Sequence, residues 1–321
     1  MKTSRALSPK IGRGRAVSGF SLIELLVGVA IGLVLTAVIT MVYVENRRVL
    51  SNQRDLSRVT QSGSQALFAI TRLAKQAGQV AWGGLGATSQ SNFSPPDFCD
   101  GVSLPTAVGS WSVDGPFLQG TDALAGSPGS SDEITFRYYG SSGPGNYTTE
   151  PVADGSVVDC AGNAIAGPLA GGTSGRMGTR LYVGNDVDGI PALFCRNLTS
   201  PVVDQVLIPG VETFQVLYGL AQAGTRNQAA TRFLPASSLA GSDWHSVVSV
   251  RFGLVVSGVD PSRTDLDNAS YEVFGSALTG TNTPAFSAAS LGSVEQRRRV
   301  RQVFSTTVEL RNSPYSVCRS S

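Results

Sequence analysis

One apolar run near the N-terminus constrains the fold of this chain more than any other feature. Residues 20–44 contain only two ionisable side chains, Glu24 and Tyr43. At about 1.5 Å per residue, a helix over this run would be about 37 Å long, enough to cross the hydrocarbon core of a bilayer. The sequence therefore predicts a membrane-spanning helix. With 41% apolar residues, the rest of the chain can still build a sizeable core.

The segment before the apolar run is basic. Residues 1–19 hold five Lys or Arg side chains and no acidic one, and their removal would change the net charge from +2 to −3. A secretory signal peptide ends its apolar stretch with a small-residue cleavage site. Here Glu45-Asn46-Arg47-Arg48 follows Val44, and the small residue, Gly19, lies before the run. An uncleaved signal anchor is the simplest interpretation of this pattern.

The position of Glu24 favours a different interpretation. A carboxylate inside a membrane segment costs a few kcal/mol, on the order of 2–3, unless it has a partner. If the chain is cut between Gly19 and Phe20, the new α-amino group of Phe20 can pair with Glu24 of a neighbouring subunit. We therefore expect residues 1–19 to be a cleaved leader.

The residues around this junction resemble the class III signal of type IV prepilins and pseudopilins: Gly19-Phe20-Ser21-Leu22-Ile23-Glu24-Leu25-Leu26. The resemblance implies that a membrane peptidase cuts after Gly19 and methylates the amine of Phe20. It also implies that Glu24 docks the subunit into a growing fibre.

The helix is expected to continue past the membrane to about Ala77. Small or apolar residues recur every three or four positions there, which predicts one buried helix face: Val49, Leu56, Val59, Gly63, Ala66, Ile70, Leu73 and Ala77. Gly78 is a candidate stop signal. The expected parts are a leader at 1–19, a fibre-core helix at 20–44, an amphipathic continuation at 45–78 and a head domain at 79–321.

The head is expected to be rich in antiparallel β-strands. Residues 83–131 are rich in Gly, Ser and Pro, which indicates long loops with short strands at most. Alternation of apolar and polar residues then predicts seven strands: 132–139, 179–183, 192–197, 202–208, 213–218, 246–257 and 300–311. In 246–257 the even positions from Val248 to Val256 should form the one buried face. The predicted class is α+β, with a long N-terminal helix packed on a β-rich head.

Several segments are similar to PilW-family minor pilins: 46–48, 65–78, 159–160, 191–196, 211–219 and 298–312. This resemblance implies a pilin-like fold and a part in type IV pilus assembly, in a complex that primes fibre growth at the tip. It implies no cofactor and four kinds of protein partner: other minor pilins, the major pilin, the prepilin peptidase and a tip adhesin. The helix would sit in the inner membrane with the head in the periplasm, before the subunit enters the pilus.

Two alternatives use the same N-terminal signal. One is a J-type minor pseudopilin of a type II secretion system. The other is a minor pilin whose head binds a ligand, either DNA or a surface. We expect no nucleic-acid partner, because the processed chain would be acidic and carries no known binding motif.

The cysteines predict disulfides, because an even number of them lies in a domain expected outside the cytoplasm. Cys99, Cys160, Cys195 and Cys318 allow three connectivities, and no CxxC spacing suggests zinc or redox chemistry. The resemblance favours Cys160–Cys195, because both match family positions. Cys99–Cys318 is then the remaining pair.

Three other motifs are weak candidates for chemistry. Asp186 and Asp188 begin like a calcium loop, but Cys195 stands where its glutamate would be, so a hairpin turn is expected and no metal. The arginines at 297–299 and 301 suggest a solvated edge or a subunit contact. His245 is the single histidine, and no hydrolase motif accompanies it, so we expect no enzyme.

Overall fold

The computed structural model describes residues 19, 21–79, 115–123, 128–143, 152–167, 176–199, 202–222, 229–278 and 284–313. The chain divides into two compact units, Met1–Leu50 and Ser51–Ser321. One helix, α1 (Leu22–Gln76), contributes residues to both. Its bounds lie within two residues of the predicted helix.

In the first unit, α1 presents its apolar side chains outward. The large apolar residues between Leu22 and Val44 are 42–80% exposed. The most apolar 18-residue window of the helix has a mean hydropathy of 2.7, and none of it is buried inside the structure. By length and composition, this part of α1 can cross a membrane.

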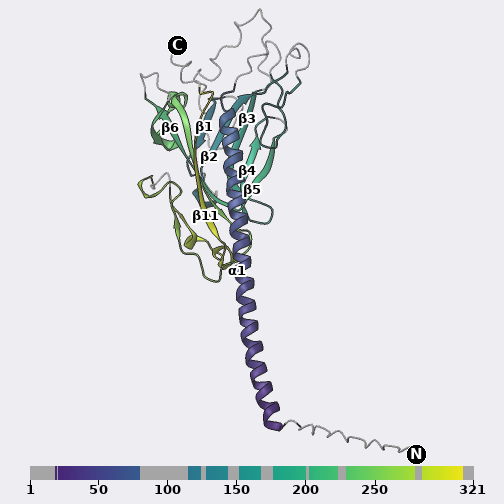
Figure 1. Cartoon of the computed structure of the whole chain (residues 1–321). Helices are drawn as coiled ribbons and strands as arrows, with labels where there is room; N and C mark the ends of the chain where they lie inside the picture. Colours follow the sequence, from purple (N-terminus) through teal and green to yellow (C-terminus); the bar gives the residue numbers. More distant parts are fainter. Residues whose placement is uncertain are drawn as a thin grey trace, which may run out of the picture. The chain divides into compact units, whose positions relative to one another are not determined.

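The second unit is built from antiparallel sheets (Figure 1). A five-stranded sheet has the order β1-β2-β3-β4-β5, a four-stranded sheet has the order β11-β8-β6-β7, and β9 pairs with β10. The strands are β1 (Leu118–Thr121), β2 (Glu133–Tyr139), β3 (Arg176–Asn185), β4 (Pro191–Asn197), β5 (Val203–Pro209), β6 (Val211–Ala221), β7 (Ala230–Leu234), β8 (Val247–Ser257), β9 (Ser270–Tyr271), β10 (Phe286–Ser287) and β11 (Arg301–Glu309). A short helix, α3 (Val294–Arg297), precedes β11.

A single large core joins the two main sheets to α1. Phe136 of β2 meets Phe252 of β8 edge-on, with ring centroids 6.4 Å apart, and Phe252 stacks on Phe214 of β6 at 6.0 Å. From α1 and the residue that follows it, Ile70 and five neighbours along one face enter the same cluster: Val59, Ala66, Leu73, Ala74 and Ala77. The class is therefore α+β, as predicted, with residues 51–76 of α1 packed on the sheets.

The buried face of α1 differs from the predicted one at its start. Leu56 is 48% exposed, whereas Asp55, the residue before it, is 6% exposed. Positions 55, 59, 63, 66, 70, 73 and 77 follow the helical period, so the polar Asp55 occupies the place that the pattern assigned to Leu56. Val49, which the same pattern included, is 46% exposed.

Two glycines determine how closely α1 packs on β11 and where the helix ends. A Cβ on Gly63 would lie 2.2 Å from the ring of Phe304 in β11, so only glycine allows this contact. Gly78 has φ +73°, a conformation that glycine adopts at helix C-termini, and its N–H donates to Arg137 O at 2.9 Å. Gly78 therefore ends the helix as the sequence predicted.

All seven predicted strands overlap observed ones, but the expectation of one buried face is wrong for β8. Val255 on the opposite face is fully buried against Val273 and Phe286, which belong to a second, smaller cluster around β9 and β10. The register between β6 and β8 also shifts near Gly219, and Val247 rather than Val248 joins the main core. Strands β1, β7, β9 and β10 were not predicted.

Candidate functional site

The processing junction lies just before α1. Gly19 and Ser21 are exposed and lie outside the helix, which begins at Leu22. Phe20 lies outside the described residues. The Gly19–Phe20 bond that the sequence marks for cleavage therefore adjoins non-helical residues.

Glu24 caps its own helix in this structure. The Ser21 N–H donates to Glu24 Oε2 at 3.1 Å, and the Glu24 N–H donates to Ser21 Oγ at 3.3 Å. This is a capping box, in which two backbone N–H groups of the first turn are satisfied reciprocally. The carboxylate also lies at the positive end of the helix dipole.

The capping box corrects one step of the sequence argument. That argument treated the amine of Phe20 as the evident partner of Glu24, but Ser21 is a second partner within the same chain. The signal was present as a Ser-x-x-Glu spacing before an apolar run. Within the described residues, Glu24 Oε1 accepts no hydrogen bond, so one carboxylate oxygen remains for a further donor.

A disulfide ties the segment 152–167 to the five-stranded sheet. Cys160 and Cys195 are bonded, with Cα atoms 6.3 Å apart, and Cys195 lies in β4. Beside them, the Asp159 carboxylate accepts hydrogen bonds from Asn163 and Asn197. The Val158 N–H donates to Gln76 Oε1 at 2.9 Å, which connects the same segment to the end of α1. Cys99 and Cys318 lie outside the described residues.

The residues of the weak calcium motif form the turn between β3 and β4. Asp186 Oδ1 accepts hydrogen bonds from the N–H groups of Asp188 and Ile190, at 2.9 and 2.8 Å. Gly189 has φ +73°, which suits a turn. Within the described ranges, no group of three or more His, Cys, Asp or Glu side chains is placed to hold a metal ion.

Arg301 is buried, contrary to the expectation of a solvated edge. Its side chain is 0% exposed, and its guanidinium donates to both Glu212 oxygens and to Asp267. The hydrogen bonds and charges of these carboxylates raise the pKa of Arg301 against the opposing effect of burial. The cluster connects β11, β6 and the loop before β9. Sequence analysis missed it because the three residues are far apart in the chain.

Two further buried carboxylates lie at the start of β2. Burial raises the pKa of Asp132 to about 8, although the N–H groups of Ala123 and Val216 donate to its carboxylate at 2.8 Å each. Burial also raises the pKa of Glu133, against the effect of its ion pair with Arg180. Asp132 therefore connects the start of β2 to β6 of the other sheet, whereas Glu133 joins β2 to β3 within the five-stranded sheet.

The single histidine lies in the 3₁₀ helix η3 (Gly241–Ser246), which leads into β8. Its neighbour Trp244 is buried and meets Tyr218 edge-on, with ring centroids 4.9 Å apart. His245 therefore lies directly before a strand.

Comparison with known proteins identifies two regions. Residues 180–312 match the family described as Type IV Pilus-assembly protein W, and residues 14–40 match the prokaryotic N-terminal methylation motif. No curated protein is significantly similar to the chain.

Among solved structures, one similar chain is a type IV-like pilin, TTHA1219, from Thermus thermophilus. It is 15% identical, covers 61% of this chain and 85% of its own length, and superimposes with a TM-score of 0.29. The methylation motif contains the Gly19–Phe20 junction and Glu24, and the PilW region contains β4, β6, β8 and β11. Residues 180–312 are therefore a region of the PilW family of type IV pilus-assembly proteins, and they follow an N-terminal methylation motif in the same chain.

Proposed function

We propose that this chain is a minor pilin that primes growth of the type IV pilus, within a complex of minor pilins at the fibre tip, and that it has no catalytic activity. The observation that supports this role is the combination in α1 of an exposed apolar segment and one carboxylate at its N-terminal end. Such a surface is stable only in apolar surroundings, which the membrane provides first and a fibre core provides afterwards.

The proposed docking step uses the two oxygens of Glu24 differently. Oε2 accepts the Ser21 N–H, which keeps the carboxylate oriented at the helix end. Oε1 then accepts a hydrogen bond from the α-amino group of Phe20 of an adjacent subunit, once residues 1–19 have been removed. An ion pair in low dielectric depends steeply on distance, so this contact selects one axial position for the incoming subunit.

The size of the head supports a position at the tip. The second unit extends from Ser51 to Ser321, and its described residues form three sheets. A large head is easier to accommodate once, at the end of a fibre, than in every repeat of a shaft. The proposed partners are other minor pilins, the major pilin and a tip adhesin, with the prepilin peptidase acting beforehand and the head facing the periplasm.

Deletion of the gene tests this function. Surface pili are counted in strains with and without the retraction ATPase. We expect few pili in the deletion strain and partial recovery when retraction is blocked, because a priming subunit shifts the balance between assembly and retraction. Normal pili with failed export of secreted enzymes would contradict the proposal and support a secretion pseudopilin.

A further inference from the structure

The strongest unexplained feature of the second unit is the side chain of Asp55. It lies on the core-facing side of α1, four residues before the buried Val59, and its side chain is 8% exposed. The Oδ2 atom is buried and has no hydrogen-bond partner among the described residues. A buried carboxylate oxygen without a donor is costly, so its position requires an explanation.

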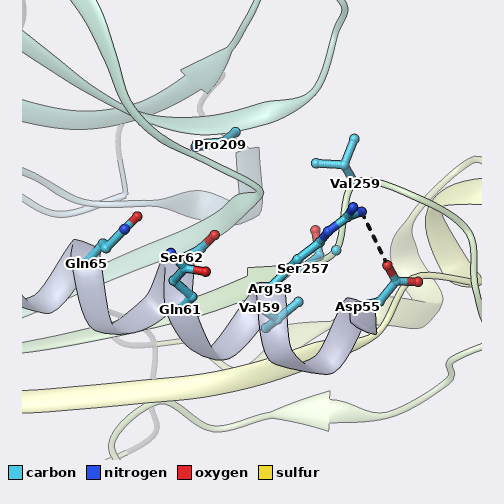
Figure 2. Close-up of a pocket in the computed structure, with 10 residues that line it drawn as sticks. Asp55, Arg58, Val59, Gln61, Ser62, Gln65, Pro209, Ser257 and Val259 are labelled. Carbon is cyan, nitrogen blue, oxygen red and sulfur yellow. Dashed lines mark ion pairs between the residues drawn. The ribbon is translucent and has the colours of Figure 1, made fainter. Parts of the chain in front are cut away.

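This carboxylate lines a cavity of about 290 Å³ (Figure 2). One wall comes from α1, with Gln61, Ser62 and Gln65, and the other comes from the ends of β5 and β8, at Pro209 and Ser257. The volume is at the lower end of the range of about 300–1,000 Å³ for small-molecule sites, so it suits one side chain better than a large ligand. We call this cavity the Asp55 pocket.

The charge around the Asp55 pocket is incompletely balanced. Arg58 Nη1 lies 3.8 Å from Asp55 Oδ1 and 3.6 Å from Asp260 Oδ2, so one cation is shared by two carboxylates. Both distances are longer than those of hydrogen bonds. Arg58 is 71% exposed, so water screens its charge from Asp55. A second positive group is therefore complementary to the pocket.

The surface next to the pocket suits a protein segment. Gln61 also lines a shallow hollow of about 480 Å³ on α1, together with Leu56, Thr60 and Ser64. Leu56 is 48% exposed there. A polar pocket and an apolar contact thus lie side by side on one stretch of helix, an arrangement that a free ion would not use.

We propose that the Asp55 pocket binds the ammonium or guanidinium group of a Lys or Arg side chain from a neighbouring pilin subunit. The basic group donates a hydrogen bond to Asp55 Oδ2, and an adjacent apolar side chain of the same subunit packs on Leu56. Charge-assisted hydrogen bonds of this kind are stronger than neutral ones and fix orientation. This inference rests on the proposed function, because it requires assembly with other pilins.

The first test uses the full-length processed chain in detergent, with n-butylammonium as the probe and n-butanol as its neutral counterpart. At constant ionic strength, we expect a saturable rise in Tm with n-butylammonium alone, because a ligand of the native state stabilises it. Asp55→Asn should weaken this binding by tenfold or more. Asp188→Asn, an exposed change in the β3–β4 turn, should leave it unchanged. Equal binding by Asp55→Asn, or no saturable binding by the wild-type chain, would overturn the proposal.

A second variant tests the pocket without relying on the folding of Asp55→Asn. Ser62→Met places a larger side chain on the pocket wall without changing any charge, and it should also abolish binding of n-butylammonium. If Asp55→Asn does not fold, loss of binding in Ser62→Met supports the pocket, and retained binding overturns it.

The partner is tested by piliation. In the retraction-competent strain, Asp55→Asn should lower the number of surface pili severalfold, while Asp188→Asn should not. If deletion of the gene abolishes pili but Asp55→Asn leaves them normal, the pocket proposal fails and the proposed function stands. If deletion itself leaves pili normal, the proposed function fails.

Discussion

Arg301 and Glu212 form a bidentate ion pair inside the second unit. Arg301 Nε lies 2.6 Å from Glu212 Oε2 and Nη2 lies 2.9 Å from Oε1, with both side chains at most 2% exposed. Asp267 Oδ2 lies 3.2 Å from Arg301 Nη1 and also accepts a hydrogen bond from the Tyr271 hydroxyl at 2.6 Å. One arginine thus joins β11 to β6 and to the loop before β9.

Removal of this arginine should strongly destabilise the fold. Arg301→Met leaves Glu212 and Asp267 without their buried cation, and breaking a buried pair costs about 3–5 kcal/mol. The free energy of unfolding is measured by urea denaturation of the full chain in detergent. Arg196→Met is the control, because Arg196 and Asp204 are 34% and 36% exposed. Exposed pairs contribute at most about 1 kcal/mol, so equal losses in the two variants would contradict this account.

Asp132 should make stability depend on pH. Its pKa is about 8 in the folded protein and 3.8 for an unperturbed side chain, so the folded state binds more protons between these values. Asp132 therefore contributes most to stability below pH 4, and this contribution is lost as the pH rises to about 8.

Asp132→Asn isolates this effect from that of the other carboxylates. We expect the stability of the wild-type chain, relative to Asp132→Asn, to fall steadily from pH 4 to pH 8. The comparison is made by urea denaturation at each pH. A difference that stays constant over this range would show that Asp132 titrates normally.

Gly63 should tolerate no side chain. A Cβ there would lie 2.2 Å from the Phe304 ring, so Gly63→Ala forces α1 and β11 apart and should cost about 1–3 kcal/mol. Gly28→Ala is the matched control in the same helix, because a Cβ at Gly28 meets nothing within 4 Å. Phe304→Leu should recover part of the loss in Gly63→Ala. Unchanged stability in Gly63→Ala would contradict the close packing described here.

The long elements could be predicted from the sequence, and the contacts between distant residues could not. Helical and alternating periods located α1 and seven strands, because each period repeats over several residues. Strands β9 and β10 have two residues each, too few for alternation to appear. Asp55 takes the place on the buried face that was predicted for Leu56, which shifts the start of that face by one residue. The sequence pattern there contains both polar and apolar residues, so it does not distinguish the two faces.

The residues of the candidate site also divide into those that the sequence indicates and those that only the folded structure reveals. The sequence singles out Gly19, Phe20 and Glu24 because the signal is local and continuous. Ser21 was missed as a capping residue, although its spacing to Glu24 was visible in the sequence. Arg301 and Glu212 are 89 residues apart, and only the folded sheet brings them together.

The most direct test of the central claim is the incorporation of Glu24→Gln into pili. Glutamine can still accept the Ser21 N–H, so this variant removes the charge and keeps the helix cap. Ser21→Ala is the control, since it loses a capping hydroxyl and keeps the carboxylate. The measurement is a quantitative immunoblot of sheared pili and membranes, with N-terminal sequencing to verify cleavage after Gly19. We predict that Glu24→Gln is cleaved but at least about tenfold depleted from pili, whereas Ser21→Ala is incorporated. Wild-type amounts of Glu24→Gln in sheared pili would contradict the docking role of Glu24.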